Sequence, residues 1–303
     1  MPKVKLIFNP IANLGRAWHI ASSLRPIVYE HGGADWAGTV YPGHASEIAH
    51  QAALEGYDVV VAMGGDGTVH EVINGLMKVP RDRRPRLGIV PLGSGNDFAF
   101  SIGISDRPDL ALRQALFGQP HPVDVGQIVD GHGRVEYWIN AIGIGFDTVV
   151  TINSRRVPLF QGFAVYFLAV LQTIAFNYFP FRLSIQTENE TWERELLMLV
   201  LCNGPREGGG FFLAPNARPD DGLFTYVSVN RISRPMMLYT LTRFLNHTHQ
   251  SLPYIHMADF KRLTLTSDRP LYIHADGEVL AGFGSTTDRL EVQLLPGELD
   301  AVV

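Results

Sequence analysis

The chain has 303 residues, a length that suits two globular domains better than one. Hydrophobic residues make up 46% of it and charged residues 18%, a composition that excludes extensive disorder. The 25 basic and 30 acidic residues give a net charge of -5, so the broad positive field of a nucleic-acid-binding protein is absent and no nucleic-acid partner is expected.

The first part of the chain, up to about Pro120, alternates short β-rich runs with helical stretches. This alternation predicts βαβ units around a parallel sheet. Strands are predicted at 4–9, 37–41, 58–63 and 86–91, and helices at 15–31, 44–55, 69–78 and briefly after Asp97. The strands at 58–63 and 86–91 are continuously apolar, as strands buried on both faces of a parallel sheet are.

A glycine-rich turn, GGDGTVH, follows the strand at 58–63 directly and occupies Gly64 to His70. Glycines let a backbone turn tightly and approach a phosphate, and the amides at the start of the next helix face an anion. The turn lacks the lysine of a Walker A loop, and His70 occupies the place of the third Rossmann glycine. The alternative is a simple strand-to-helix turn in which Asp66 caps the helix.

A second glycine-rich turn, PLGSGNDFA, follows the strand at 86–91 in the same way. Two such turns at the carboxyl ends of adjacent strands mark the crevice where open α/β sheets bind ligands. Asp66 and Asp97 could then share a hydrated Mg²⁺ beside the phosphates, and Ser94 could donate to a phosphate. Helix capping is the alternative role for Asn96 and Asp97.

Beyond residue 120 the sequence changes to alternating β patterns separated by turn signals, including the hairpin-like DGHG at 130–133. Strands are predicted at 122–129, 134–144, 181–186, 191–202, 223–229, 261–266, 271–275 and 290–295, with a helix between Arg234 and Asn246. The predicted division is therefore an α/β domain of residues 1–120 and a β-rich, mainly antiparallel domain of residues 121–303.

An uncharged apolar segment, Leu159 to Tyr178, is long enough to cross a bilayer. Polar residues interrupt it, among them Gln161, Gln172 and Asn177, and no other part of the chain resembles a second span. These features favour a buried or lipid-facing helix over a transmembrane one. The single cysteine, Cys202, excludes an intramolecular disulfide and favours a reducing compartment.

Five motifs together resemble the diacylglycerol kinase catalytic domain family, which includes bacterial lipid kinases and sphingosine kinases. They occur in the family's order and span nearly the whole chain: Asn9-Pro10, GGDGT at 64–68, GSGND at 93–97, APNARPDDGLF at 214–224 and ADGE at 275–278. One departure is NPIANLGRA at 9–17, where the family commonly has a Ser-Gly pair soon after Asn-Pro.

The resemblance implies that the α/β domain binds ATP with Mg²⁺, that the β-rich domain accepts the lipid, and that the active site lies in the cleft between them. It assigns nucleotide contacts to Asn9, Thr39, Gly64, Gly65, Asp66, Gly67, Thr68, Val69, His70, Gly93, Ser94 and Asn96.

For catalysis, the resemblance implies Glu278 as the proton acceptor, with Asp276 beside it, and Asp66 as the rival base. We favour Glu278 as the base and assign Asp66 and Asp97 to the metal. Asp276-Gly277 taken alone is typical of a hairpin turn. The scheme requires Asp66, Asp97 and Glu278 to meet around a common gap.

A second metal site is also implied away from the cleft, at Asp221 with the carbonyls of Arg218 and Leu223. Oxygen ligands of this kind suit a hard cation such as Mg²⁺. The alternative is a turn before the strand that follows.

The expected function is transfer of the γ-phosphate of ATP to a hydroxyl of a membrane lipid such as diacylglycerol, in the cytoplasm at the inner face of the membrane. Arginines at 81, 83, 84 and 86, together with Arg155 and Arg156, could meet anionic headgroups, although a solvated loop face is favoured. Homodimerisation occurs in many family members, but the sequence carries no interface signature. The alternatives are a soluble-substrate kinase of the NAD kinase or phosphofructokinase type and a non-catalytic lipid-binding protein.

Overall fold

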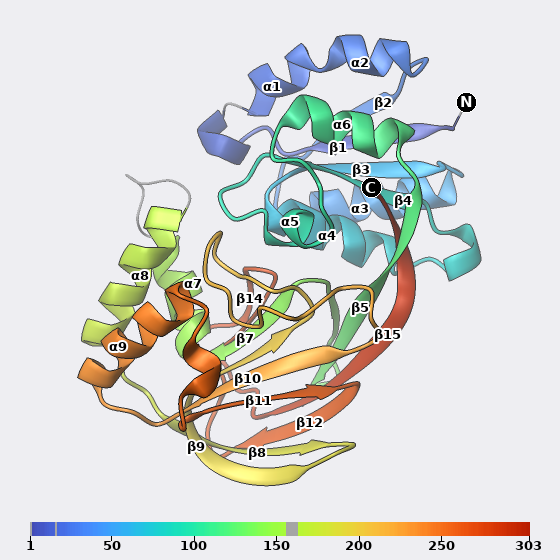
Figure 1. Cartoon of the computed structure of the whole chain (residues 1–303). Coiled ribbons are helices and arrows are strands. Elements are labelled where there is room, and N and C mark those ends of the chain that lie inside the picture. The colour runs from blue at the N-terminus through green and yellow to red at the C-terminus, as the bar shows by residue number, and fades with distance from the viewer. Residues whose placement is uncertain (1, 16, 156–162) are drawn as a thin grey trace. The chain divides into compact units, whose positions relative to one another are not determined.

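The structure is a computed structural model that describes residues 2–15, 17–155 and 163–303 (Figure 1). Its contacts divide the chain into two compact units, unit 1 (residues 1–125 and 296–303) and unit 2 (residues 126–295). The predicted second domain included the last eight residues, whereas their contacts join them to unit 1. The reason is a strand pairing, because Ala301 near the C-terminus pairs with Leu87 in the parallel sheet.

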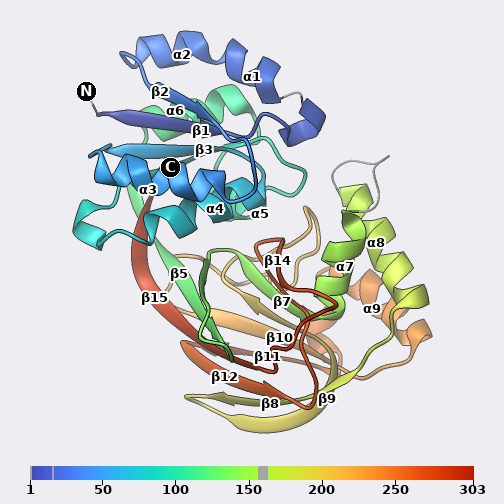
Figure 2. The same cartoon turned by 180° about the vertical axis from the view of Figure 1, so that it is seen from behind.

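Unit 1 is built on a parallel sheet of apolar strands. Its elements are β1 (Val4–Phe8), η1 (Ala12–Gly15), α1 (Ala17–Ser23), α2 (Arg25–Glu30), β2 (Asp35–Gly38), α3 (His44–Leu54), β3 (Val59–Gly64), α4 (Asp66–Leu76), η2 (Arg81–Arg83), β4 (Arg86–Pro91), α5 (Asp97–Ser101) and α6 (Pro108–Phe117). The strand order is β4-β3-β1-β2, and all of these pairs are parallel. Two opposite views show α1, α2 and α6 on one face of this sheet and α3 and α4 on the other (Figures 1 and 2). Because both faces are covered, every residue of β3 is buried, as its continuous apolar run predicts.

Unit 2 is mainly antiparallel. Its strands are β5 (Pro120–Asp130, which begins in unit 1), β6 (Val135–Trp138), β7 (Ala141–Gly145), β8 (Phe181–Thr187), β9 (Thr191–Cys202), β10 (Phe224–Asn230), β11 (Ile255–Phe260), β12 (Arg262–Ser267), β13 (Ile273–Ala275), β14 (Glu278–Ala281) and β15 (Arg289–Val302, which ends in unit 1). They follow the order β14-β13-β7-β9-β8-β12-β15, while β10 pairs with β9 and β11, and β5 pairs with β6 and β15. This arrangement confirms the predicted combination of an α/β domain and a β-rich domain.

Among the residues of unit 2 that the structure describes, the sheet is accompanied by α7 (Phe146–Ser154), α8 (Phe163–Phe176), α9 (Arg234–Leu245) and the short 3-10 turn η3 (His249–Ser251). The helices gather at one side of the sheet in both opposite views (Figures 1 and 2). They bury a second apolar core against β9 and β10, separate from the core around Trp138 and Tyr226. The sheet therefore packs side chains on both of its faces.

The apolar segment predicted as a buried or lipid-facing helix forms α8, of 14 residues. Residues 159–162 at its predicted start, like Arg156, lie outside the described residues. Within the part of the chain that the structure describes, each helix is too short or too polar to cross a bilayer.

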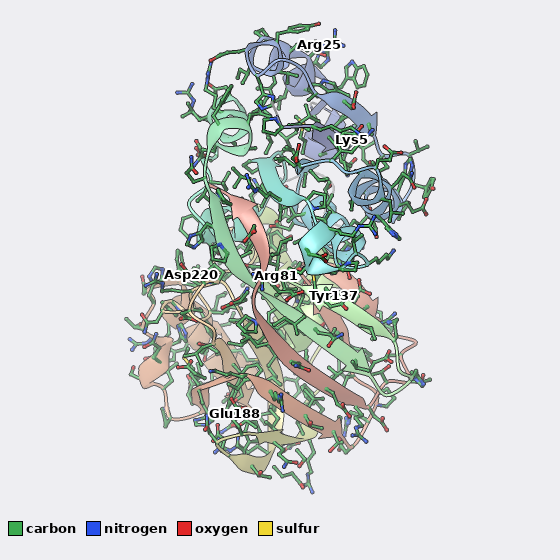
Figure 3. All side chains as sticks on the ribbon, turned by 90° about the vertical axis from the view of Figure 1, so that its right-hand side faces the viewer. Lys5, Arg25, Arg81, Tyr137, Glu188 and Asp220 are labelled. Atoms are coloured by element: carbon green, nitrogen blue, oxygen red, sulfur yellow. The ribbon has the colours of Figure 1, made fainter. Side chains whose placement is uncertain are left out.

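A polar network lies on the sheet of unit 2 around Glu190. The Tyr226 hydroxyl and the His256 Nε2 both donate to its carboxylate, the latter at 3.2 Å, and Trp192 Nε1 donates to the Tyr226 hydroxyl at 3.1 Å. Burial by itself would raise the pKa of Glu190, but the hydrogen bonds from Tyr226 and His256 outweigh it and lower the pKa below its ordinary value. Nearby, Glu188, labelled in Figure 3, lies in the turn between β8 and β9. Its carboxylate accepts the N–H groups of Lys261 and Arg262 and so ties this turn to the one between β11 and β12.

Candidate active site

The carboxyl ends of four neighbouring strands in unit 1 carry the residues predicted to contact the nucleotide. Phe8 at the end of β1 lies in register with Gly38 of β2 and Met63 of β3, and Gly64 lies in register with Pro91 of β4. The segments that follow these strands, at Asn9, Thr39, 64–70 and 93–96, are therefore brought to one edge of the sheet.

The two glycine-rich turns are in direct backbone contact there. A Cβ added to Gly93 would lie 2.4 Å from the Cα of Gly65, and one added to Gly64 would lie 2.2 Å from the Thr68 hydroxyl oxygen. Leu92 N–H donates to the Gly64 carbonyl at 2.7 Å, and Asn96 closes its own turn by accepting from Gly93 N–H at 2.9 Å. Only glycine fits at these positions, because the backbone of the turns approaches so closely. The sequence pattern by itself does not indicate this packing requirement.

Asp66 ties the two turns together. Its carboxylate accepts the backbone N–H of Asn96 at 2.7 Å and that of Asp97 at 2.8 Å. The helix after the first turn begins at Asp66 and not at Val69 as predicted, so Asp66 lies in the first helical turn and reaches across to the second loop. Asp66 therefore connects the two glycine-rich loops instead of capping its own helix.

Asp66 and Asp97 face a common point. A Cβ added to Gly95 would lie 2.8 Å from Asp66 Oδ2 and 2.9 Å from Asp97 Oδ2, and Asp97 is buried. Two carboxylate oxygens beside a position that carries no side chain form a donor set that suits a hard cation such as Mg²⁺. The structure thus brings together the two predicted metal ligands of unit 1.

Ser94 is exposed, and His70 is buried with its Nε2 3.3 Å from the Asn74 amide nitrogen. Thr39 donates its N–H to the Phe8 carbonyl at 2.9 Å, and the Asn9 side-chain oxygen accepts the N–H of Ile11 at 3.1 Å. Ser94 therefore offers an accessible hydroxyl, while His70 has a packing role that the motif alone does not indicate.

The ADGE motif forms the hairpin between β13 and β14 in unit 2. Asp276 and Gly277 occupy its two-residue turn with φ angles of 50° and 82°, as a type I′ turn requires. The Asp276 carboxylate accepts three backbone N–H groups, from Ile139 at 3.0 Å, Asn140 at 2.8 Å and Ala141 at 3.1 Å. Asp276 is therefore buried and engaged in holding the backbone between β6 and β7.

Glu278 stands just after this turn and is accessible, with 42% of its side chain exposed. Arg155, at the end of α7, donates to Glu278 Oε2 at 2.8 Å and to the Gly277 carbonyl at 2.8 Å. The joining of Glu278 with the two aspartates of unit 1 into one active site remains a prediction.

The predicted second metal site lies in the turn before β10. Asp221 Oδ1 accepts the N–H of Leu223 at 3.0 Å, and Arg218 donates to Asp220 at 3.3 Å. This is the capped turn that was the alternative to a metal, and the metal site itself remains a prediction.

The four arginines at 81–86 divide into two kinds. Arg81, Arg83 and Arg86 are exposed, and Figure 3 labels Arg81 in η2. The side chain of Arg84 is only 6% exposed, and it donates to the Glu298 carbonyl at 2.6 Å and the Val79 carbonyl at 2.9 Å. Arg84 is thus an internal brace between η2 and the C-terminal strand and belongs to no surface patch.

Unit 2 contains an apolar pocket that the sequence did not locate, with about 780 Å³ of empty space, part of it open to solvent. Its walls come from α7, α8, α9, β9, β10 and the segment 207–213, and they include Tyr166, Val170, Ile174, Phe211, Leu241 and Phe244. Asp147 and Glu207 supply carboxylates to the otherwise apolar lining. Behind them lies His274, fully buried, with Nε2 at 3.0 Å from Asp147 and 3.2 Å from Glu207.

These three residues are far apart in the chain and carry no common motif, so sequence reasoning missed them. The one local signal for this cluster in the sequence is Asp147, an acidic residue in the first turn of α7, the helix that follows β7. Their side chains offer three potential ligand atoms within 4.8 Å of one another. The cluster and the pocket together form a polar-ended apolar site within unit 2.

Comparisons with known proteins agree with this architecture. Residues 3–128 match the model of the diacylglycerol kinase catalytic domain, and residues 140–303 match the YegS C-terminal NAD kinase beta sandwich-like domain. A Chromohalobacter salexigens protein named "Probable lipid kinase YegS-like" is 35% identical over 239 residues, which cover 78% of this chain and 74% of that protein. A Bacillus subtilis protein named "Diacylglycerol kinase" is 29% identical over 286 residues, which cover 92% of this chain and 90% of that protein.

A solved structure of a diacylglycerol kinase from Bacillus anthracis superposes with a TM-score of 0.74 at 21% identity, over 99% of this chain and 96% of that one. At this identity the likeness supports the fold alone. The two-unit fold and the family matches define the protein as a kinase. Within that class, the chain belongs to the lipid kinase family of diacylglycerol kinases and YegS-like proteins.

Proposed function

We propose that the protein transfers the γ-phosphate of ATP to a hydroxyl of a membrane lipid such as diacylglycerol. The observation that carries this proposal is the apolar pocket of unit 2, because a kinase of sugars or NAD has no use for an apolar pocket between helices. Its walls suit an acyl chain, and its two carboxylates suit a polar headgroup.

The nucleotide phosphates would be held in unit 1 by the backbone of the two glycine turns and by the N-terminus of α4. Ser94 is accessible to donate a hydrogen bond to them. Asp66 and Asp97 would hold Mg²⁺, which when bound neutralises charge that builds up on the leaving phosphate groups. In unit 1 itself, Asp66 keeps the second turn in place through its two backbone hydrogen bonds.

Glu278 is the group we assign as the base. It is accessible, whereas both oxygens of Asp66 accept backbone N–H groups. As the lipid hydroxyl oxygen forms its bond to the γ-phosphorus, the hydroxyl proton passes to Glu278 and the bond to the bridging oxygen of ADP breaks. Asp276 acts as a positioning residue, since its three backbone hydrogen bonds hold the turn that carries Glu278.

The test offers the purified protein diacylglycerol, a sphingoid base and phosphatidylglycerol in mixed micelles with labelled ATP and Mg²⁺, and identifies the product by mass spectrometry. We expect a phosphorylated lipid, and we expect Glu278→Gln to lower kcat by at least about a hundredfold. Glu193→Gln, a change of an exposed glutamate in the same unit, should leave kcat unchanged. Phosphorylation of sugars or NAD with none of lipids would refute the proposal, and binding of lipid without any transfer would support a non-catalytic lipid-binding protein.

We also propose that the face of α8 and α9 meets the membrane surface. Exposed apolar side chains occur on α8 and α9 and just after α8, including Phe176 at 76%, Phe179, Met236 and Tyr239. Such side chains favour insertion at a lipid interface. Phe176→Ser should weaken co-sedimentation with phospholipid vesicles, whereas Val40→Ser, at an equally exposed site of unit 1, should not. Equal sedimentation of both variants with the parent protein would argue against this face. Homodimerisation remains a prediction.

A further inference from the structure

We infer that the stacked rings of Tyr41 and His44 form the platform on which the base of the nucleotide stacks, and that Glu71 holds this platform in position. The inference rests on the proposed function, because it names a further part of the nucleotide site in unit 1. It concerns nucleotide binding alone and involves no step of the phosphoryl transfer.

The two rings are stacked where the segment after β2 leads into α3. Their centroids lie 4.5 Å apart, with an angle of 16° between the ring planes. Val40 N–H donates to His44 Nδ1 at 3.1 Å, and the Tyr41 hydroxyl donates to Glu47 Oε2 at 2.6 Å. Tyr41 is nevertheless 50% exposed. The rings are therefore held in one orientation, while half of the tyrosine remains open to a further ring.

The platform lies at the edge of the sheet that carries the two glycine turns. Phe8 at the end of β1 is in register with Gly38 at the end of β2 and with Met63 of β3. Thr39 N–H donates to the Phe8 carbonyl at 2.9 Å, and Tyr41 follows two residues later. Because β2 lies two strand spacings from β3, the two strand ends are about 10 Å apart. A ribose and two phosphates can span this separation between a terminal phosphate and a base.

The order of the strands directs the base toward β2. Beyond β4 the sheet continues with β15, but Ala301 of β15 pairs with Leu87 near the start of β4, and β15 ends at Val302. The strand β15 therefore stops short of the edge at which β4 ends. Within the described part of unit 1, this edge extends from the glycine turns toward β1 and β2. A base attached to phosphates at those turns thus finds the surface of unit 1 on the β2 side.

Glu71 ties the platform to α4, the helix that begins in the first glycine turn. Its two carboxylate oxygens accept separate backbone N–H groups, that of Gly43 at 2.7 Å and that of Ala45 at 3.1 Å. One turn further along α4, a Cβ added to Gly75 would overlap the Ser46 carbonyl oxygen, so α3 and α4 are in close contact. The helix that starts at the phosphate site therefore also fixes the start of α3, and Glu71 is a positioning residue for the platform.

The charges around the platform suit a base and not a phosphate. The N–H groups of Gly43 and Ala45 at the start of α3 already donate to Glu71, and the Tyr41 hydroxyl donates to Glu47. These two carboxylates repel a phosphate, since like charges raise each other's energy. An uncharged aromatic base has no such cost, and it stacks on any aromatic side chain. The phosphates therefore belong to the glycine turns and the base to the platform.

The experiment measures binding by calorimetry, with Mg²⁺ and without lipid, of two probes: adenylyl imidodiphosphate, a non-hydrolysable analogue of ATP, and inorganic tripolyphosphate, which has no base. Tyr41→Ala removes the ring and should weaken the ATP analogue about tenfold, while tripolyphosphate stays within about twofold of the parent protein. Tyr41→Phe keeps the ring and should bind the analogue within about threefold of the parent. Glu71→Gln leaves one of its two N–H partners without an acceptor, and it should weaken the analogue about five- to tenfold but spare tripolyphosphate.

Kinetics and matched controls separate the platform from the fold. In the lipid kinase assay, Tyr41→Ala and Glu71→Gln should raise KM for ATP by the same factors and leave kcat and KM for the lipid unchanged, a split that loss of stability does not produce. Tyr29→Ala, at a 75% exposed tyrosine of α2, and Glu55→Gln, at an exposed glutamate beyond the other end of α3, should bind both probes as the parent does. Thermal unfolding and retained tripolyphosphate binding show that each variant is folded.

Unchanged binding of the ATP analogue by Tyr41→Ala would overturn the platform, and unchanged binding by Glu71→Gln would overturn the role of Glu71. Equal weakening of both probes would also refute the inference, because it would place these residues at the phosphates. Since the binding assay contains no lipid, the expected selectivity without any lipid phosphorylation would count against the proposed kinase reaction alone. Lipid phosphorylation with an unchanged KM for ATP in both variants would count against the platform alone, and a parent protein that does not bind the analogue would contradict both proposals.

Discussion

Replacing Asp276 by Asn tests whether a buried carboxylate holds unit 2 together. Asn tolerates the left-handed φ of 50° at this position, so the change removes the charge and one acceptor without disturbing the turn. If the amide oxygen takes the place of Oδ1, it keeps the N–H groups of Asn140 and Ala141, and the amide nitrogen then faces the N–H of Ile139.

The substitution therefore leaves one buried N–H, that of Ile139, without an acceptor. It also replaces two hydrogen bonds to a charged oxygen, from Asn140 and Ala141, with bonds to a neutral one. Hydrogen bonds to charged groups contribute about 1.5 to 3 kcal/mol, and neutral ones about half of that. We therefore expect the free energy of unfolding of unit 2 to fall by about 2 to 4 kcal/mol. For a domain of this size, the corresponding fall in Tm is about 5 to 15 °C.

The assay is differential scanning calorimetry with urea titration of the same samples, which separates a change in stability from a change in unfolded-state compactness. Asp268→Asn is the matched control, because Asp268 also accepts a backbone N–H, from Arg182, but in an exposed position. It should cost less than about 1 kcal/mol. A D276N protein within about 0.5 kcal/mol of the parent would refute the reasoning that Asp276 is a positioning residue.

Three further changes have definite expectations. Gly95→Ala would push a methyl group between the two aspartates of unit 1 and should lower kcat/KM by about a hundredfold, whereas Gly284→Ala, which has open space, should be neutral in the same lipid kinase assay. The pKa of Glu190 is lowered in the folded state, so ionised Glu190 stabilises the fold fully above its ordinary pKa of 4.5, and this contribution is lost as the pH falls through the lower folded value. Chemical denaturation should therefore show a smaller drop in unfolding free energy from pH 6 to pH 3 for Glu190→Gln than for the parent protein. An identical drop in both proteins would contradict this. Arg84→Gln removes a buried brace and should cost about 2 to 4 kcal/mol of unfolding free energy, against less than about 0.5 kcal/mol for the exposed Arg83→Gln, and equal costs would disprove the brace.

The sequence alone determined the class of fold and the placement of the nucleotide loops. Continuous apolar strands followed at once by glycines predict a parallel sheet with loops at one edge, because strand burial and backbone freedom are local properties of residue type. The adjacency of β3 and β4 follows from the same local pattern and is confirmed. The two turns of unit 1 and the hairpin at Asp276-Gly277 were accordingly predicted at the correct residues.

Other features came only from contacts between distant residues. The strand predicted at 134–144 is broken into β6 and β7 at Ile139 and Asn140, because their N–H groups turn toward Asp276, more than a hundred residues later. Helix capping was the alternative role for Asp66, but the backbone N–H groups that it accepts belong to the next loop.

The site formed by Asp147, Glu207 and His274 is the extreme case. Asp147 belongs to α7, Glu207 to the segment between β9 and β10, and His274 to β13, and no spacing along the chain connects them. Pairing of β7 with β13 places His274 beside Gly143, and the helices that pack on the sheet supply the apolar walls. Local sequence encodes which backbone shapes are available, whereas the meeting of side chains depends on strand pairing and packing over the whole unit, and for that reason only the tertiary structure could reveal this site.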